Sequence, residues 1–422
     1  MRYYLILCYL ICIMAAANSG CGTDSDAQEI RVGVMLPITG DWSSQGAISN
    51  VALGIADDDI NSLLKDSGSS RRVNLTTEDT GTDPETALRE LKNLGGQGIR
   101  LVIAAVSSSE LYAMKDYANA NNIIIIGTAS TSPSLAIPED NVIRLVPDDI
   151  NQGKAMAELL KLENITAIVP ITRGDVWGRG LLNATKSSFE GNGGVVLEGV
   201  SYEPGTDPSS GINKLSAIVK ECKSRFSPAG IGVYLVSFDE AIPLMAMASR
   251  DPELSSVRWF GSDGIANSSS LAENSTAAEF ACKTGLICPI YGVVPGQFIR
   301  NMSDYENVIE AIRQNTGSSP SGYALASYDA LWIASESMIL SESGNNSQLK
   351  EALTNIANRF TGITGPLSIN NAGDRESATY QFLALNKTND NYFWQIAGDF
   401  RSGPSGGVLN FRGQTAKVRT AL

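Results

Sequence analysis

Four short strand-like segments, each followed by a helical pattern, constrain the fold of this chain more than any other feature. Three of them are apolar runs, Arg31–Leu36, Ile99–Ala105 and Ile123–Ile126, and in the fourth Val73, Leu75 and Thr77 alternate with other residues. Between them, apolar residues recur at helical spacing. A chain that alternates strands and helices in this way forms a parallel sheet with helices on both faces. We therefore predict a doubly wound α/β lobe.

The alternation restarts after the polar segment Pro147-Asp148-Asp149 and predicts a second α/β lobe. The 422 residues allow two or three domains. Further along, helical patterns at 305–314 and 324–340 precede a strand-rich end from Gly365. The expected boundaries give lobe 1 residues 29–147 and about 293–358, and lobe 2 residues 148–292 and about 359–422.

Charge and composition exclude several classes of function. The formal net charge of −13 argues against nucleic acid as a partner, because phosphate binding needs a basic surface. The sequence contains no histidine, which excludes Ser-His-Asp and Cys-His nucleophiles and histidine-ligated zinc or iron sites. Carboxylate-based or lysine-based chemistry remains open. We expect no metal and no cofactor, and the acidic run Asp57-Asp58-Asp59 is interpreted as a solvated helix face.

The N-terminus has the pattern of an export signal. Arg2 precedes the apolar run Leu5–Ala17, which is shorter than the roughly 20 residues that span a membrane. Cys21 ends a segment similar to a lipoprotein cleavage box, although Asn18 stands where an aliphatic residue is usual. We expect a signal peptide over 1–21, a lipid on Cys21 and a polar tether over 22–28. Ordinary secretion, with Cys21 incidental, is the alternative.

Three cysteines remain after the N-terminal region. In an exported protein, a disulfide between Cys282 and Cys288 would close a small loop. Cys222 would then be an unpaired, buried thiol.

Three polar loops follow predicted strands of the first lobe. They are the segments Pro37–Gly46, Val106–Ser109 and Gly127–Pro133, all rich in small residues. The carboxyl ends of parallel strands share one edge of a sheet, and ligands of open α/β folds bind there. A helix begins after the first two loops, so free backbone N–H groups and a helix N-terminus can face a small anion. This arrangement indicates solute binding and argues against catalysis.

Segments of the chain resemble, in order and spacing, the leucine/isoleucine/valine-binding protein family of ABC-transporter solute receptors. They read GVMLPITGDWSSQG, EDTGTDPETAL, VSSSELYAMKDYA, IIIIGTASTSPSL, GDVWGRGL and FGSDGIAN. The resemblance covers nearly all of the chain after its first residues. It implies two doubly wound α/β lobes that are joined by three hinge crossings, the type I periplasmic binding protein fold, and that close around one solute.

The resemblance also assigns roles to residues of the three loops and to one acid. Ser108, Ala129 and Thr131 match the positions that hold the α-carboxylate of the ligand, and we include Ser130 between them. A helix end carries a partial positive charge, which favours an anion there. Asp263 stands at the position of the acid that faces the α-ammonium, where the family usually has glutamate. Its alternative role is a turn aspartate before a glycine.

Aromatic residues complete the expected site. Trp177 and Phe238 match positions on the second lobe that clamp the ligand, although either could be ordinary core. Trp42 and Gln45 of the first loop are expected to contact the ligand side chain. Gln45 replaces a frequent aromatic residue, which is compatible with a more polar side chain than that of leucine.

Together, these features predict an exported, lipid-anchored monomer that binds a small amino acid, branched-chain or related, and delivers it to an ABC permease. One alternative is a sensor domain for amides, urea or aromatic acids that feeds a signalling partner. The other is an enzyme of the glycosidase kind, which requires two acids that flank a cleft. Only Asp263 has a predicted place in the cleft, so a second acid facing it would favour the enzyme.

Overall fold

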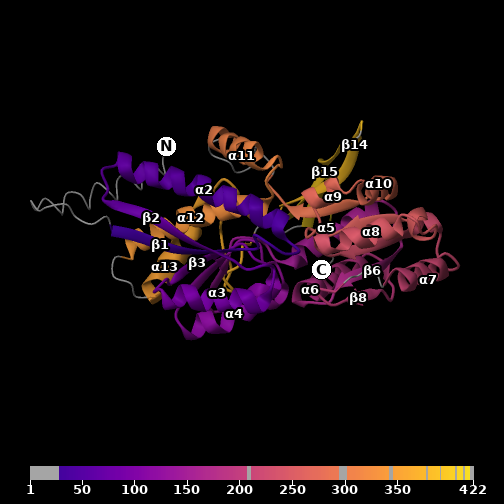
Figure 1. Cartoon of the computed structure of the whole chain (residues 1–422). Helices are drawn as coiled ribbons and strands as arrows, with labels where there is room; N and C mark the ends of the chain where they lie inside the picture. Colours follow the sequence, from indigo (N-terminus) through magenta and orange to yellow (C-terminus); the bar gives the residue numbers. More distant parts are fainter. Residues whose placement is uncertain are drawn as a thin grey trace, which may run out of the picture.

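Two α/β lobes lie side by side along the molecule, each with its own sheet (Figure 1). The computed structural model describes residues 28–206, 211–293, 302–341, 346–376, 379–389, 391–403, 406–411 and 414–418. The expected export signal, Cys21 and nearly all of the tether lie outside these residues. No helix in the described ranges is long and apolar enough to cross a membrane.

The first lobe is built on a parallel five-stranded sheet with the order β2-β1-β3-β4-β5. Its central strands are apolar and fully buried because helices cover both faces of the sheet. The strands are β1 Gln28–Leu36, β2 Arg71–Asp79, β3 Leu101–Ala104, β4 Ile124–Gly127 and β5 Val142–Arg144.

Helices α2 and α12 pack together over one face of this sheet, while α3 and α4 cover the other (Figure 1). Helix α11 lies against α2, and α13 lies against α12. Local sequence explains where these helices begin: for α3, the Asp83 carboxylate accepts a hydrogen bond from the Thr86 N–H at 2.7 Å, and Pro84 takes the first turn. The helices are α2 Ser43–Asp66, α3 Pro84–Gly96, α4 Ser108–Ala120, α11 Met302–Thr316, α12 Gly322–Leu340 and α13 Asn346–Ala357.

The second lobe contains a larger mixed sheet with the order β17-β16-β15-β14-β11-β10-β9-β6-β7, and β8 also pairs with β6. Its first strands are parallel, and the strand-rich end of the chain adds an antiparallel meander to β11. The strands are β6 Ala167–Arg173, β7 Val195–Val196, β8 Val200–Tyr202, β9 Ile231–Val236, β10 Arg258–Gly261, β11 Ile287–Tyr291, β14 Thr379–Thr388, β15 Asn391–Gly403, β16 Gly406–Phe411 and β17 Gln414–Val418.

Helices cover both faces of the second sheet as well. The pair α5 and α6 shares the core of one face, and α7, α8 and α10 share the core of the other. The helices are α5 Asp149–Leu162, α6 Val176–Gly191, α7 Ile212–Cys222, α8 Ile242–Ala248, α9 Ser269–Glu273 and α10 Ser275–Thr284.

The chain passes between the lobes three times, after β5, after β11 and after α13. The first and third passages lie side by side, since Arg144 and Asp374 form a parallel β-bridge. The small strands β12 Thr361–Gly362 and β13 Gly365–Pro366 precede the third passage. This arrangement agrees with the expected two lobes and three hinge crossings.

The predicted disulfide between Cys282 and Cys288 is wrong, because all three described cysteines are free. Cys282 lies on α10, where its thiol donates to the Leu385 carbonyl at 3.3 Å. Cys288 lies within β11 and is fully buried in the core under Gly261. A helix end and a left-handed turn at Gly285 separate the two side chains and direct them to different surroundings. Cys222 is buried, as predicted.

Candidate functional site

Helix N-termini from both lobes converge where the lobes face each other. Helices α2, α4 and α12 of the first lobe begin there, as do α5 and α6 of the second. Bonds cross between them: the Asp149 N–H donates to the Thr131 carbonyl at 2.8 Å, and the Ser132 hydroxyl donates to the Val176 carbonyl at 3.3 Å. Each helix start carries a partial positive charge, which explains why buried carboxylates gather in this cleft.

One end of the cleft is built from hydroxyl and backbone N–H groups. Ser108, at the first position of α4, accepts hydrogen bonds on its Oγ from the N–H groups of Thr131 and Ser132, each at 3.0 Å. Ser107 caps the helix through a reciprocal pair of bonds with Glu110. Because Ser108 Oγ already accepts two hydrogen bonds, its hydroxyl proton is left to donate to a ligand.

The remaining residues of this loop are also buried. Ala129 is buried, and the Ser130 hydroxyl donates to the Val106 carbonyl at 2.7 Å, so it is engaged within the loop. The structure therefore brings together the four residues expected at the carboxylate. We name Ser108, Ala129, Ser130 and Thr131 the anion end of the cleft.

A chain of hydrogen bonds leads from the anion end to two buried aspartates. The Gln152 side chain bridges them: its amide donates to Asp149 Oδ1 at 3.3 Å, and its carbonyl accepts the Asp263 N–H at 3.2 Å. The Tyr323 hydroxyl of the first lobe donates to Asp263 Oδ2 at 2.7 Å. Asp263 is only 3% exposed, and Asp149 is fully buried. We name Asp149 and Asp263 the acid pair.

The acid pair has unsatisfied oxygens. Within the described residues, Asp149 Oδ2, Asp263 Oδ1 and the hydroxyl of the adjacent Thr131 have no hydrogen-bond partner. Buried polar atoms are nearly always paired, so three in one place indicate a site for a missing donor. Burial raises the pKa of Asp263; burial and the neighbouring Asp263 charge raise the pKa of Asp149. A cation would relieve both effects.

The expected aromatic residues form one continuous stack across the cleft. The Phe238 ring lies between the rings of Trp42, at a centroid distance of 4.8 Å, and Trp177, at 4.5 Å. Trp42 belongs to the first lobe and the other two to the second, so the stack joins the lobes. Gly264 lies against it: a Cβ there would come within 2.6 Å of both Phe238 and Trp177.

Gln45 lies at the edge of this cleft with its side-chain amide engaged. The amide nitrogen donates to Ser49 Oγ at 2.9 Å, and its oxygen accepts from the Ser321 hydroxyl at 2.9 Å. The side chain is 7% exposed. Contact between Gln45 and a ligand thus stays a prediction.

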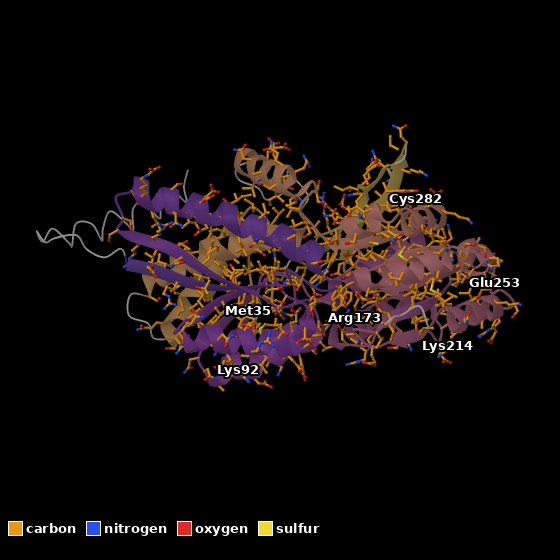
Figure 2. All side chains as sticks on the ribbon, in the orientation of Figure 1. Met35, Lys92, Arg173, Lys214, Glu253 and Cys282 are labelled. Carbon is orange, nitrogen blue, oxygen red and sulfur yellow. The ribbon has the colours of Figure 1, made fainter. Side chains whose placement is uncertain are left out.

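A second group of acids lies beyond the aromatic stack and contains its own cation. Arg173, at the junction of the lobes (Figure 2), pairs with Asp175 at 2.7 Å, Glu240 at 2.8 Å and Asp41 at 3.1 Å. Its guanidinium also lies over the Phe238 ring. Burial opposes its charge, but the carboxylates of Glu240 and Asp175 outweigh burial and raise the pKa of Arg173 above its ordinary value. We name Arg173 and its three acids the arginine cluster.

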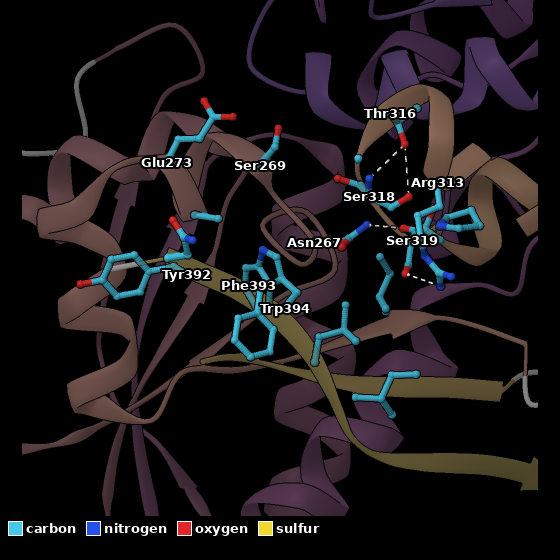
Figure 3. Close-up of a pocket in the computed structure, with 18 of the residues that line it drawn as sticks. Asn267, Ser269, Glu273, Arg313, Thr316, Ser318, Ser319, Tyr392, Phe393 and Trp394 are labelled. Atoms are coloured by element: carbon cyan, nitrogen blue, oxygen red, sulfur yellow. Dashed lines mark hydrogen bonds between the residues drawn. The ribbon is translucent and has the colours of Figure 1, made fainter. Parts of the chain in front are cut away.

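A cavity of about 640 Å³ is lined by residues of both lobes (Figure 3). Asn267 of the second lobe and Ser319 of the first face each other across it, joined by a hydrogen bond of 2.7 Å. Phe393 and Trp394 of β15 line its second-lobe side. None of the residues predicted to bind the ligand lines this cavity, although Ser321, the partner of Gln45, does.

Five residues escaped prediction: Asp149, Gln152, Arg173 and Tyr323 in the cleft, and Arg144 outside it. Asp149 lies in the segment that was interpreted as a polar break between the lobes. Its position at the start of a helix is the sequence signal that could have identified it as a residue of the cleft. Within the described residues, no group of three or more acids or cysteines is arranged to hold a metal ion.

Comparison with known families and sequences gives consistent matches. The family model described as the receptor family ligand binding region matches residues 48–388. The uncharacterized protein MJ1266 of Methanocaldococcus jannaschii is 27% identical over 92% of this chain and 94% of its own length. The Leu/Ile/Val-binding protein homolog 3 of Brucella melitensis is 25% identical over 60% of this chain and 66% of its own.

Solved structures share the fold over most of the chain. The leucine-binding protein LivK of Thermotoga maritima matches with a TM-score of 0.67 and 20% identity, covering 87% of this chain and 97% of that protein. A solute-binding protein of an ABC transporter from Rhodopseudomonas palustris, in complex with 3,4-dihydroxybenzoic acid, matches with a TM-score of 0.68 and 14% identity, covering 93% and 98%. The two neighbours thus bind different kinds of small acid.

Proposed function

We propose, on the premise that this chain belongs to the receptor ligand-binding-region family of type I periplasmic binding proteins, that it binds a small amino acid. Several relatives and structural neighbours are named as solute-binding proteins, some of them of ABC transporters. The finer assignment concerns the chemistry of the ligand: a primary ammonium and a carboxylate on one carbon, with a branched-chain or related side chain.

The observation that carries this proposal is the set of three unpaired oxygens at the acid pair. A primary ammonium has three N–H donors, and Asp149 Oδ2, Asp263 Oδ1 and Thr131 Oγ1 provide three acceptors. Burying carboxylates without a cation costs free energy. A ligand that supplies the cation removes much of this penalty, and the free energy recovered contributes to its binding. An aromatic acid supplies no such cation.

The anion end supports the other half of the ligand. The Ser108 hydroxyl and the loop around Ala129 and Thr131 offer donors to a carboxylate, next to the start of α4. An amino acid would be held at both ends. Micromolar affinity corresponds to a binding free energy of about −8 kcal/mol, which one ion pair and several hydrogen bonds can provide.

The proposed cycle follows from the two lobes. The ligand binds one lobe, the other closes over it, and the closed surface docks on an ABC permease. Tyr323 and Asp263, one from each lobe, meet only when the lobes are together. We propose lobe boundaries near residues 147, 292 and 358, and export as a monomer with a lipid on Cys21 as its membrane anchor.

An enzyme is the second candidate, because a second acid near Asp263 is the feature that a glycosidase requires, and Asp149 provides one. Binding is favoured because the relatives whose names state a role are solute-binding proteins. Release of nitrophenol from chromogenic glycosides would favour the enzyme.

Isothermal titration calorimetry against leucine, leucinamide, benzoate and urea tests the proposal. We expect leucine or a related amino acid to bind with micromolar affinity, and benzoate and urea to bind far more weakly. Tight binding of benzoate alone would contradict an amino-acid ligand and favour an aromatic acid. Tight binding of urea alone would favour the amide sensor.

A further inference from the structure

Arg144, the last residue of β5, is a fully buried charge outside the cleft. Its guanidinium forms a two-pronged ion pair with Asp374: Nε lies 2.6 Å from Oδ1, and Nη2 lies 2.7 Å from Oδ2. Its remaining nitrogen, Nη1, donates to the Ser132 carbonyl at 2.8 Å and to the Ser130 carbonyl at 3.3 Å. One side chain therefore touches both a hinge crossing and the anion end.

Backbone bonds fix Arg144 and Asp374 against each other. The Arg144 N–H donates to the Gly373 carbonyl at 2.9 Å, and its carbonyl accepts the Arg375 N–H at 3.0 Å. These bonds join the first and third passages between the lobes. Movement of the third passage must consequently move the guanidinium that holds residues 130–132.

The hydrogen bonds continue from Arg144 to the group that faces the ligand. The Ser130 carbonyl belongs to the same peptide unit as the Thr131 N–H, which donates to Ser108 Oγ at 3.0 Å. A charged donor on the carbonyl polarises the N–H of that unit, and hydrogen bonds in such chains strengthen one another. The last donor in the chain is the Ser108 hydroxyl.

We propose that Arg144 is a positioning residue for the carboxylate of the ligand, and that Asp374, on the third crossing, holds it in that position. The inference rests on the proposed function, since it assumes a carboxylate at Ser108. In addition, we infer that the affinity of the anion end for a carboxylate depends on Arg144, a hinge residue that does not contact the ligand.

The geometry of arginine is essential to this role. Its planar fork binds Asp374 with two nitrogens while the third reaches the loop. Lysine keeps the charge, but its three donors share one nitrogen, so it cannot reproduce the two-pronged pair with Asp374 and the bonds to the loop at the same time. The bonds from Nη1 to the carbonyls of Ser130 and Ser132 satisfy its donors and fix residues 130–132 relative to the third crossing.

The test compares leucine with leucinamide, which keeps the ammonium and side chain but lacks the carboxylate charge. Calorimetry gives the ratio of the two affinities for the wild type, Arg144→Lys and Asp374→Asn, with folding checked by circular dichroism. We expect Arg144→Lys to reduce the preference for leucine by about tenfold, the effect of weakening one charge-assisted hydrogen bond. Asp374→Asn, which keeps the arginine, should reduce it less.

Arg375→Lys is the matched control. Arg375 is a buried arginine of the same crossing, but its bonds go to Thr364, Pro366 and Leu145 and not to the anion end. The Arg375→Lys variant should lower stability and leave the ratio of leucine affinity to leucinamide affinity unchanged.

If Arg144→Lys and Asp374→Asn also leave that ratio unchanged, Arg144 is merely structural and the inference is wrong. A wild type that binds leucinamide as well as leucine would instead refute a carboxylate at Ser108, and with it the proposed function.

Discussion

The cleft contains two groups of buried acids that differ in the source of their positive charge. The arginine cluster has Arg173 at its centre, so the fold itself neutralises Asp41, Asp175 and Glu240. The acid pair forms no ion pair with a described residue, although the Arg144 charge acts on Asp149, and it keeps unpaired oxygens. Where the fold supplies a paired cation, the charge cluster joins the lobes. Where it does not, we propose that the ligand supplies the cation.

The interlobe contacts fit this division. Near the arginine cluster, the Ser44 hydroxyl donates to Asp239 Oδ2 at 2.9 Å, and the Asp239 N–H donates to the Asp41 carbonyl at 3.1 Å. These bonds and the aromatic stack join the lobes with no contribution from a ligand. At the acid pair, the bond between Tyr323 and Asp263 joins them next to the unpaired oxygens. Ligand binding at that point would add the missing bonds.

The largest expected effect is a loss of stability when the cation of the arginine cluster is removed. Arg173→Met leaves the buried carboxylates of Asp175 and Glu240 without their cation, beside the partly exposed Asp41, so the free energy of unfolding should fall by about 3–5 kcal/mol. Urea denaturation monitored by circular dichroism measures it. Arg89→Met, at a side chain that is 61% exposed, is the control and should change stability by less than about 0.5 kcal/mol. Similar values for the two variants would mean that the cluster does not stabilise the fold.

Removing one member of the acid pair should act on binding. Asp263→Ala is expected to weaken leucine binding by about 2–5 kcal/mol, the usual loss when one partner of a buried charge pair is removed. Calorimetry measures the affinity, with Asp116→Ala, at a side chain that is 83% exposed, as the control. An unchanged affinity for leucine in Asp263→Ala would show that the ammonium binds elsewhere.

The acid pair should also contribute to the pH dependence of stability. The pKa values of Asp149 and Asp263 are raised in the folded protein above the ordinary value of 3.8, so the folded state binds more protons than the unfolded state. Their contribution to stability is fully present below that value and is lost as pH rises through the raised values.

This dependence can be measured by thermal unfolding of the free protein between about pH 4 and about pH 7, in comparison with the double variant Asp149→Asn, Asp263→Asn. The wild type should lose stability relative to the variant as pH rises, and saturating leucine should reduce that loss. Parallel curves for the two proteins would indicate that the acid pair keeps ordinary pKa values.

The smallest effect is expected at Cys282, where a disulfide was predicted from sequence. With a free thiol, Cys282→Ser should change the free energy of unfolding by less than about 0.5 kcal/mol, and a reducing agent should leave the melting temperature unchanged. A disulfide closing a short loop typically contributes about 2–4 kcal/mol. A loss of that size on reduction would contradict the free cysteines.

The fold was predictable because its signals are local. Buried strands such as β3 and β4 are uninterrupted apolar runs, and helix starts such as Asp83-Pro84 carry their own caps. Strand pairing has no such local signal. The strands β7 and β8, for example, pair with different parts of β6.

The site was predictable in part for the same reason. Residues in recognisable loops, such as Ser108 and Thr131, stand next to the strands that place them. Asp149 and Gln152 were missed because nothing in their own segment shows which acid they approach. Arg144 meets Asp374, which lies 230 residues further along the chain. Only the folded sheet and hinge bring such residues together.

The most direct test of the central claim, that the acid pair binds the ammonium of the ligand, compares leucine with 4-methylpentanoate in calorimetry at neutral pH. The second compound keeps the carboxylate and the side chain and lacks only the ammonium. The account predicts that 4-methylpentanoate binds at least about 2 kcal/mol more weakly than leucine, since it leaves buried charges unpaired. Equal affinities for the two compounds would contradict it.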